Sequence, residues 1–322
     1  MARIFLTRRI PEEGLAMLRE HEMDIYEGDA PPTKEEIIEG VRGKDVLICL
    51  LTDPIDAEVI DASPRLKIIA NYAVGIDNID VKAATERGIS VTNTPGVLTE
   101  TVADLTWALL MSVARRIVES DAFMRDGKFK GWAPLLMLGS DVHRKTLGII
   151  GAGRIGRAVA ARARGFGMKV LYYSRSRNEE IERSCNARFV DLQTLLEESD
   201  YVSLHTPFNE HTYHLIGEKE LRLMKPSAYL INTARGKCID ERALARALKE
   251  GWIRGAALDV FEHEPAVTPE LLELDNVVLA PHIGSASYET RSKMAVMVAE
   301  NVRAVLQGVM PPNCVNPDVW KK

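Results

Sequence analysis

Three glycines, Gly151, Gly153 and Gly156, constrain the fold of this chain more than any other feature. They lie between an apolar run at residues 146–150 and an alanine-rich segment that begins at Arg154. The apolar run predicts a buried strand and the segment after it predicts a helix. The spacing Gly-x-Gly-x-x-Gly between a strand and a helix is typical of a βαβ unit. The chain is therefore expected to contain a parallel sheet with crossover helices.

The same alternation of apolar runs and amphipathic segments continues along the whole chain, which predicts an α/β fold. The predicted strands fall into two series, residues 3–7, 46–51, 66–71 and 89–92 in the first, and residues 146–150, 169–173, 201–204, 228–232, 256–259 and 277–280 in the second. The predicted helices include residues 12–20, an apolar helix over 101–114 with an N-terminal cap at Thr101, and a last helix over about 287–307. The 322 residues exceed what one hydrophobic core usually organises. Two doubly wound domains, Rossmann-like or flavodoxin-like and with parallel sheets, are expected.

Composition excludes several classes of protein. A net charge of −5 and the lack of a basic stripe argue against nucleic-acid binding. No apolar stretch has the length of a membrane span or of a signal-peptide core, so a cytoplasmic protein without membrane partners is expected. The four cysteines lie far apart without a Cys-x-x-Cys pair, which argues against a metal site and against a disulfide framework.

The glycine motif predicts a dinucleotide site. Gly151 permits a tight turn, Gly153 lets the backbone approach a pyrophosphate, and Gly156 lets the helix pack closely on the strand. The N-terminus of the helix supplies N–H donors and partial positive charge. The residues of this predicted cofactor site are Gly151, Ala152, Gly153, Arg154, Ile155 and Gly156.

The residues after the next strand bear on the choice of nicotinamide cofactor. An Asp or Glu at this strand end would bind the ribose 2′-hydroxyl of NAD(H). The strand over 169–173 is followed instead by Ser174, Arg175, Ser176 and Arg177, which offer hydroxyl and guanidinium groups to a 2′-phosphate. We therefore expect NADP(H) to be preferred. NAD(H) stays possible, because a missing carboxylate does not by itself exclude it.

Three further segments each follow a predicted strand of the second series, at residues 232–236, 259–265 and 281–285. Doubly wound sheets bind ligands at the carboxyl ends of their strands, so these segments are expected to converge. With them in this order, the chain resembles the D-2-hydroxyacid dehydrogenases, and within that family the glyoxylate and hydroxypyruvate reductases. Residues 71–77 and 127–132 carry further motifs of the resemblance, which covers almost the whole chain.

The resemblance implies roles for individual residues. Arg235, Glu264 and His282 match the family's catalytic residues. Cofactor contacts are implied for His205, Thr206, Pro207, Thr233, Ala234, Asp259 and Gly284. Substrate contacts are implied for Leu50, Val74, Gly75 and Trp132, together with Arg235 and His282. Trp132 is equally well interpreted as an ordinary core or interface residue.

These residue types suit the reduction of a 2-oxo acid, which adds a hydride to the carbonyl carbon and a proton to its oxygen. Arg235 stays charged and can hold two oxygens in one plane, and His282 can donate the proton. A carboxylate beside His282 favours imidazolium and orients the ring. Glu262 competes for this role with Glu264, which is preferred because Pro265 follows it as in the family.

The other histidines receive no catalytic role. His205 is expected to shape a turn beside the cofactor. Solvated positions are expected for His21, His143, His211, His214 and His263.

The resemblance also implies a domain organisation. Residues 1–97 with 286–322 would form a substrate-binding domain, and residues 98–285 would form an inserted NAD(P)-binding Rossmann domain. Closure of the two domains would involve hinges near Pro95 and Gly284. A homodimer is expected, with the helix over 101–114 and the connector over 126–132 at its interface, because such a helix would otherwise expose an apolar patch.

Two other functions stay open. Within the family, the oxidation of a phosphonate or of another D-2-hydroxy acid would use the same Arg, Glu and His set. In a different class, a nicotinamide-sensing protein of the transcriptional corepressor kind would share the fold, which does not decide function by itself.

Overall fold

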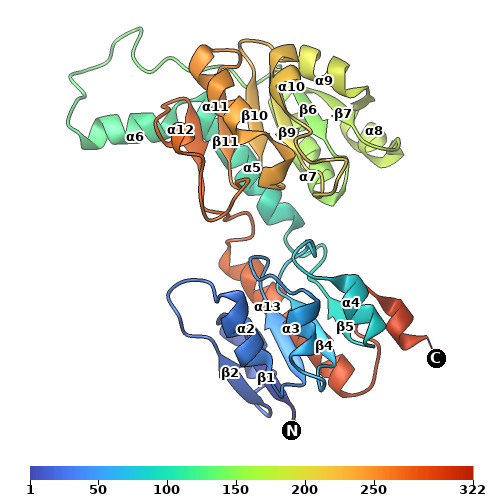
Figure 1. The fold of residues 1–322 in the computed structure, drawn as a ribbon. Helices are drawn as coiled ribbons and strands as arrows, with labels where there is room; N and C mark the ends of the chain where they lie inside the picture. The colour runs from blue at the N-terminus through green and yellow to red at the C-terminus, as the bar shows by residue number, and fades with distance from the viewer. Residues whose placement is uncertain (322) are drawn as a thin grey trace. The chain divides into compact units, whose positions relative to one another are not determined.

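The structure is a computed structural model that describes residues 1–321. The chain divides into two compact units. Unit 1 comprises Met1–Leu98 and the segment from Ser285 onward, and unit 2 comprises Thr99–Gly284. Both are α/β units with helices on the two faces of a parallel sheet (Figure 1). The expected fold class is confirmed.

The sheet of unit 1 has five parallel strands in the order β2-β1-β3-β4-β5. This is the flavodoxin-like order, in which the switch point lies between the first and third strands. The strands are β1 (Arg3–Leu6), β2 (Glu22–Ile25), β3 (Val46–Cys49), β4 (Ile68–Asn71) and β5 (Ser90–Thr92). The helices are α1 (Glu12–Ala16), α2 (Lys34–Val41), α3 (Ala57–Asp61), α4 (Val81–Glu86) and α13 (Tyr288–Leu306), followed by the 3₁₀ turn η3 (Pro317–Trp320).

The core of unit 1 lies on both faces of this sheet, because each buried strand sends alternate side chains to opposite sides. Ile37 of α2 and Val59 of α3 pack with Leu47 against one face. Leu15 of α1 and Val298 of α13 pack against the other face. The last helix, predicted over about 287–307, therefore belongs to the core of unit 1.

Two details of the prediction for unit 1 are wrong. The prediction gave four strands and missed β2, whose sequence Glu-Met-Asp-Ile alternates exposed and half-buried residues. Such a short, charged strand is typical of a sheet edge. The helix predicted over 12–20 ends at Ala16, because residues 17–20 form turns.

The sheet of unit 2 has seven parallel strands in the order β12-β11-β10-β9-β6-β7-β8, which contains the Rossmann order with its switch point between β6 and β9. The strands are β6 (Thr146–Ile150), β7 (Lys169–Tyr173), β8 (Arg188–Phe189), β9 (Tyr201–Leu204), β10 (Tyr229–Asn232), β11 (Gly255–Leu258) and β12 (Val277–Leu279). The helical elements are α5 (Thr99–Ala114), α6 (Ile117–Arg125), α7 (Arg154–Ala163), η1 (Arg164–Phe166), α8 (Glu179–Cys185), α9 (Leu192–Glu198), α10 (Glu218–Leu223), η2 (Gly236–Cys238), α11 (Glu241–Glu250) and α12 (Pro269–Leu272).

The prediction for unit 2 missed one strand and misplaced the start of a helix. β8, with two residues, is too short for an alternating pattern, and the prediction gave six strands instead of seven. Helix α5 begins at Thr99, so Thr101 lies within its first turn and does not cap it.

The apolar residues of α5 are not a free surface. Val102, Leu109, Leu110 and Val113 are buried, and α5 packs with α7 on one face of the sheet. The expectation that this helix exposes an apolar patch is therefore wrong. On the other face, the core includes residues of α9, α10 and α11.

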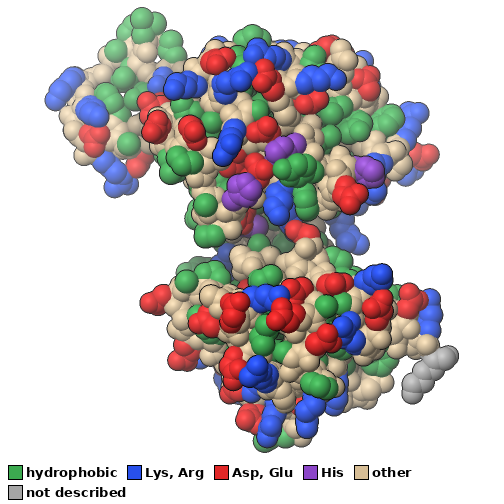
Figure 2. Space-filling view, in the orientation of Figure 1, with side chains coloured by type: hydrophobic (Ala, Val, Ile, Leu, Met, Phe, Trp, Pro, Cys, Tyr) green, Lys and Arg blue, Asp and Glu red, His purple; other side chains and the backbone are tan. Residues whose placement is uncertain are grey.

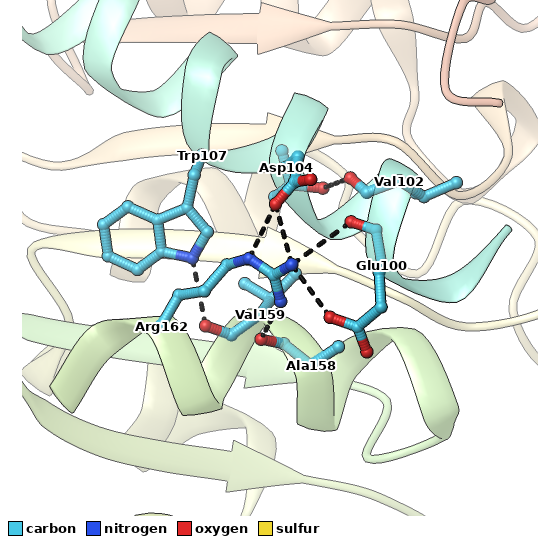
Figure 3. A network of polar contacts seen from close by, with 8 residues as sticks. Glu100, Val102, Asp104, Trp107, Ala158, Val159 and Arg162 are labelled. Carbon is cyan, nitrogen blue, oxygen red and sulfur yellow. Dashed lines mark hydrogen bonds and ion pairs between the residues drawn. The ribbon is translucent and has the colours of Figure 1, made fainter. Parts of the chain in front are cut away.

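Polar contacts join the start of α5 to α7 (Figure 3). The guanidinium group of Arg162 donates to the side chains of Glu100 and Asp104 and to the carbonyl of Glu100. The indole N–H of Trp107 donates to the carbonyl of Val159 at 3.0 Å. The Arg162 side chain is only 27% exposed, so its contacts are partly shielded from solvent. These contacts hold the two helices against each other.

Within residues 1–321, no helix combines the length and the apolar character that crossing a membrane would require.

Candidate active site

The glycine motif forms the turn between β6 and α7. Gly151 has φ +101°, and a Cβ there would lie 2.6 Å from the carbonyl oxygen of His205. A Cβ on Gly156 would lie 2.1 Å from the carbonyl oxygen of Gly151, so the helix could not pack as closely with any other residue. Beside Gly153, by contrast, a Cβ would have no neighbouring atom within 4 Å among the described residues. This open backbone at the N-terminus of α7 fits a pyrophosphate group.

The turn after β7 lies next to the backbone of residues 151–156, which we call the glycine cradle. Asn178 donates from Nδ2 to the carbonyl of Ala152 at 2.8 Å and caps α8 with its Oδ1. Arg177 forms a two-pronged ion pair with Glu182, at 2.8 Å and 3.1 Å. Arg175 is exposed. The two guanidinium groups of the predicted phosphate site therefore differ, since Arg177 is already bound to a carboxylate.

His205 follows β9 at the switch point of the sheet. Its Nε2 shares a hydrogen bond of 2.9 Å with the hydroxyl of Ser203. Its Nδ1 is buried and has no hydrogen-bond partner among residues 1–321. Burial lowers the pKa of His205 to about 3, so the ring is neutral near pH 7. The adjacent Thr206 contacts Cys238 and Pro207 is exposed.

This depressed pKa predicts a loss of stability in mild acid. The unfolded chain binds a proton at His205 below about pH 6.5, whereas the folded chain does so only near pH 3, so stability falls as the pH decreases between these values. From pH 7 to pH 5 the loss is expected to be roughly 1–2 kcal/mol. Urea unfolding of unit 2 at both pH values measures it. His205→Gln should remove this part of the pH dependence, whereas substitution of the exposed His143 by Gln should retain it.

His282 and Glu264 form a hydrogen-bonded pair. The Nδ1 of His282 lies 2.8 Å from the Oε2 of Glu264, and both side chains are about a quarter exposed, at 27% and 24%. The other oxygen of Glu264 accepts from the N–H of Phe261 at 3.0 Å. Burial alone would raise the pKa of Glu264, but the hydrogen bond and charge of His282, the Phe261 N–H and the charge of Arg235 outweigh it and lower the pKa. An ionised Glu264 holds the Nδ1–H of His282 and leaves the other ring nitrogen to a ligand.

The competing carboxylate, Glu262, lies elsewhere. Its Oε1 is 2.7 Å from the Nε2 of His214. The structure therefore brings Glu264, and not Glu262, to His282, which agrees with the preference for Glu264. His214 was predicted at a solvated position, which is wrong, because its side chain is only 30% exposed and paired. His21 is also mostly buried, at 13% exposure.

Asp259 lies at the end of β11 and is buried. Its Oδ1 accepts from the N–H of Ile283 at 2.7 Å, which fixes the segment that carries His282. Its Oδ2 is buried without a hydrogen-bond partner in the described part of the chain. Burial is the main cause that raises the pKa of Asp259. Gly284 lies beside this carboxylate, since a Cβ there would be 3.2 Å from Oδ2.

The turn that carries Arg235 is held from both sides. Asn232 accepts from the N–H of Ala234 and donates to the carbonyl of Arg235, at 3.0 Å and 2.9 Å. The hydroxyl of Thr233 meets that of Thr106 in α5 at 2.8 Å. Next to Arg235, a Cβ on Gly236 would lie 1.9 Å from the carbonyl carbon of Phe261. The Arg235 turn and the loop of Glu264 are therefore in direct backbone contact.

In unit 1, the predicted substrate residues lie in loops after β3 and β4. The carbonyl of Gly75 accepts from Asn71 at 2.7 Å and that of Val74 accepts from Asn93 at 2.8 Å. Leu50 is half-buried, and its N–H donates to Asp53 at 2.6 Å.

Trp132 lies in the segment that follows α6 and is 85% exposed, so it is not a core residue of this chain. Figure 2 shows hydrophobic side chains gathered on this part of unit 2. The exposed large hydrophobic residues of α6 and the segment after it are Ile117, Val118, Met124, Phe129, Trp132, Leu135, Leu136 and Leu138.

Residues 107–284 match the family described as D-isomer specific 2-hydroxyacid dehydrogenase, NAD binding domain. The chain belongs to this family. It is therefore an oxidoreductase that uses a nicotinamide cofactor on a small 2-oxo or 2-hydroxy acid. Its two parallel-sheet units, the glycine cradle and the Arg, Glu and His segments agree with this membership.

Relatives of this dehydrogenase match it over nearly their whole length. A glyoxylate reductase from Korarchaeum cryptofilum is 60% identical over 99% of this chain and 97% of its own. Among solved structures, a Thermus thermophilus protein is 48% identical with a TM-score of 0.92, over 97% of this chain and 99% of its own. An NADPH-dependent glyoxylate/hydroxypyruvate reductase from Sinorhizobium meliloti, in complex with NADP and malonate, is 34% identical with a TM-score of 0.85, over 98% of this chain and 96% of its own.

Proposed function

We propose that this dehydrogenase reduces glyoxylate, and hydroxypyruvate as a second substrate, to the 2-hydroxy acid, with NADPH as the preferred cofactor. The observation that carries the proposal is the pair of His282 and Glu264, joined at 2.8 Å in a loop-to-loop contact at the carboxyl ends of β11 and β12. The activities of the relatives from Korarchaeum cryptofilum and Sinorhizobium meliloti support the choice of substrate.

Each residue has a distinct part in this reaction. The bound nicotinamide supplies the hydride. Glu264 holds the Nδ1–H of His282, so that the other ring nitrogen can carry the proton for the carbonyl oxygen. Arg235 provides the fixed positive charge that binds the carboxylate and polarises the carbonyl group.

The two units divide these tasks. Unit 2 would bind the cofactor at residues 151–156, at the turn after β7, and at the turns that contain His205, Thr233 and Asp259. Unit 1 would bind the substrate carboxylate through the N–H groups of Val74 and Gly75, whose carbonyl groups are fixed by asparagine side chains. Leu50 would contact the rest of the substrate, and Trp132 would contact it from α6's following segment or from a second subunit.

The experiment that tests this function is steady-state oxidation of NADPH and NADH with glyoxylate, hydroxypyruvate and pyruvate in parallel. Fast turnover of glyoxylate with NADPH is expected. Turnover of pyruvate alone would contradict the proposal that glyoxylate and hydroxypyruvate are the substrates. Silence with all three acids would point to phosphonate oxidation, or to cofactor sensing without catalysis if NADPH still binds.

The preference for NADPH predicts unequal roles for the two arginines after β7. Arg175→Ala is expected to lower kcat/KM for NADPH by roughly 10–100-fold and to leave NADH nearly unchanged, because it removes a charge-assisted contact with the 2′-phosphate. Arg177→Ala is the matched control, since Arg177 is bound to Glu182. Its effect should be several-fold smaller. Equal losses for NADPH and NADH in Arg175→Ala would contradict this assignment.

We also propose a homodimer, held by α6 and the segment after it in place of the buried α5. Eight exposed large hydrophobic residues lie from Ile117 to Leu138, and exposed apolar side chains that gather in one place mark interaction sites. A pocket of about 540 Å³ lies beside them, lined among others by Arg116, Glu119, Leu138, Tyr229 and Arg254.

Leu135→Asp is expected to shift the protein from dimer to monomer in sedimentation velocity, because it places a charge in the apolar interface. Leu272→Asp on α12 is the control, since Leu272 is also exposed, at 64%, but lies outside this segment. A wild-type protein that sediments as a monomer would exclude the dimer.

A further inference from the structure

The loop after β11 contains two glutamates, and each of them binds a histidine from another segment. Glu264 binds His282, which follows β12. Glu262 binds His214, which follows β9, at 2.7 Å. The proposed function uses only the first pair. The second pair is the less exposed at its carboxylate, since the Glu262 side chain is 11% exposed and that of Glu264 is 24% exposed.

His214 joins three segments of unit 2. Its N–H donates to the carbonyl of Lys237 at 2.9 Å, two residues after Arg235. Its ring nitrogen Nε2 contacts Glu262, and its ring stacks on that of Tyr213 with the two ring centroids 4.0 Å apart. The segments after β9, β10 and β11 therefore meet at this one residue.

The backbone of His214 is unusual as well. It has φ +47°, in the left-handed region that few residues other than glycine adopt, although asparagine, aspartate and histidine do so more often than the rest. His282 shares this feature, with φ +53°. Such conformations persist only where the surrounding structure imposes them, and they concentrate at functional sites. Both histidines of the two pairs are therefore held in costly conformations that aim their rings at the same loop.

Glu262 is fixed at its backbone in addition to its side chain. Its N–H donates at 2.6 Å to Glu241, a buried carboxylate that also accepts from the hydroxyl of Thr268. The peptide between Phe261 and Glu262 lies directly against Gly236. Glu264, two residues after Glu262, forms the hydrogen bond with His282. Glu262 is thus the last anchored side chain before the proposed catalytic carboxylate.

We propose that His214 is a positioning residue, which through Glu262 fixes the loop so that Glu264 meets the ring of His282. The inference rests on the proposed function only for its kinetic consequence. Its structural consequence, an ordered bond between Glu264 and His282, holds whatever the substrate is.

The test uses His214→Asn, because asparagine tolerates the left-handed backbone but is too short to reach Glu262. His263→Asn is the matched control. His263 is next to the same glutamate, but its Nε2 lies 3.9 Å from Glu262 and its side chain is 75% exposed. Glu262→Ala removes the contact from the other side, and Glu262→Gln keeps an oxygen acceptor for the His214 ring.

The first measurement is the downfield proton resonance of the His282 Nδ1–H in ¹⁵N-histidine-labelled full-length protein without cofactor, identified by its loss in His282→Asn. His214→Asn and Glu262→Ala should broaden or shift this resonance, whereas His263→Asn and Glu262→Gln should preserve it. The second is kinetic. His214→Asn and Glu262→Ala should lower kcat by roughly 10–100-fold, as expected for a misplaced catalytic group, with little change in NADPH affinity.

An unchanged resonance in both His214→Asn and Glu262→Ala would overturn the proposal, as would an equal loss in the His263→Asn control. A change of the resonance in an enzyme that is inactive with all three 2-oxo acids would support the positioning role and refute the proposed substrate instead. The two failures are therefore distinguishable.

Discussion

His282→Asn is expected to lower kcat/KM for glyoxylate by roughly 100–10,000-fold, the usual contribution of a general acid. Asparagine is the suitable replacement because His282 has φ +53°, which asparagine adopts at little cost. Its amide N–H₂ can still donate to Glu264, so the loop keeps its hydrogen bond. What the variant loses is the second ring nitrogen, which would carry the proton in the proposed reaction.

Steady-state kinetics and NADPH titration of the same preparation separate an effect on the chemical step from an effect on cofactor binding. NADPH affinity should stay within a few-fold of the wild type, since the glycine cradle at residues 151–156 is untouched. His143→Asn, at an exposed histidine of the same unit, should leave both quantities unchanged. A loss of less than tenfold in His282→Asn would mean that another group, or water, donates the proton.

Gly236→Ala is expected to abolish most of the activity while unit 2 stays folded. A Cβ at this position would lie 1.9 Å from the carbonyl carbon of Phe261 and 2.4 Å from the nitrogen of Glu262. Because these are backbone atoms, no side-chain rotation relieves the clash. The Arg235 turn and the loop of Glu264 must move apart. Overpacking of this kind costs roughly 1–3 kcal/mol of stability. A displacement of about 1 Å can lower activity on the order of 100-fold.

Gly165→Ala provides the control for this substitution. A Cβ on Gly165, in η1 of the same unit, would have no described atom within 4 Å. Its activity and melting temperature should equal those of the wild type. Kinetics together with thermal unfolding test the pair of variants. Wild-type kcat/KM in Gly236→Ala would show that the contact between the two segments is not needed for the reaction.

The elements that the sequence predicts well are those that burial dictates. The central strands such as β6 and β9 are mostly apolar and buried, because both of their faces are covered by helices. The glycine motif was readable because two of its positions allow no Cβ and the third borders open space. The edge strands β2 and β8 were missed, since an edge strand is short, charged and little buried.

The candidate site shows the same division. Strand ends predicted that the three segments containing Arg235, Glu264 and His282 converge, because topology brings the ends of parallel strands together. The family resemblance singled out these three residues within the segments. The contact of His214 with Glu262 was not predicted, because a histidine in a loop belongs to no periodic pattern and Glu262 lies 48 residues away in the sequence. For α5, the sequence shows how apolar the helix is but not which surface covers it, and its apolar residues pack against α7 and the sheet.

The close contact between Gly236 and the Phe261–Glu262 peptide has a consequence for how this enzyme can be redesigned. Segments that touch backbone to backbone tolerate few changes of sequence, because a substitution in one displaces the other. Directed evolution toward larger 2-oxo acids should therefore accumulate replacements around Leu50 and Val74, where side chains are only half-buried, and leave Gly236, Phe261 and Glu262 nearly unchanged.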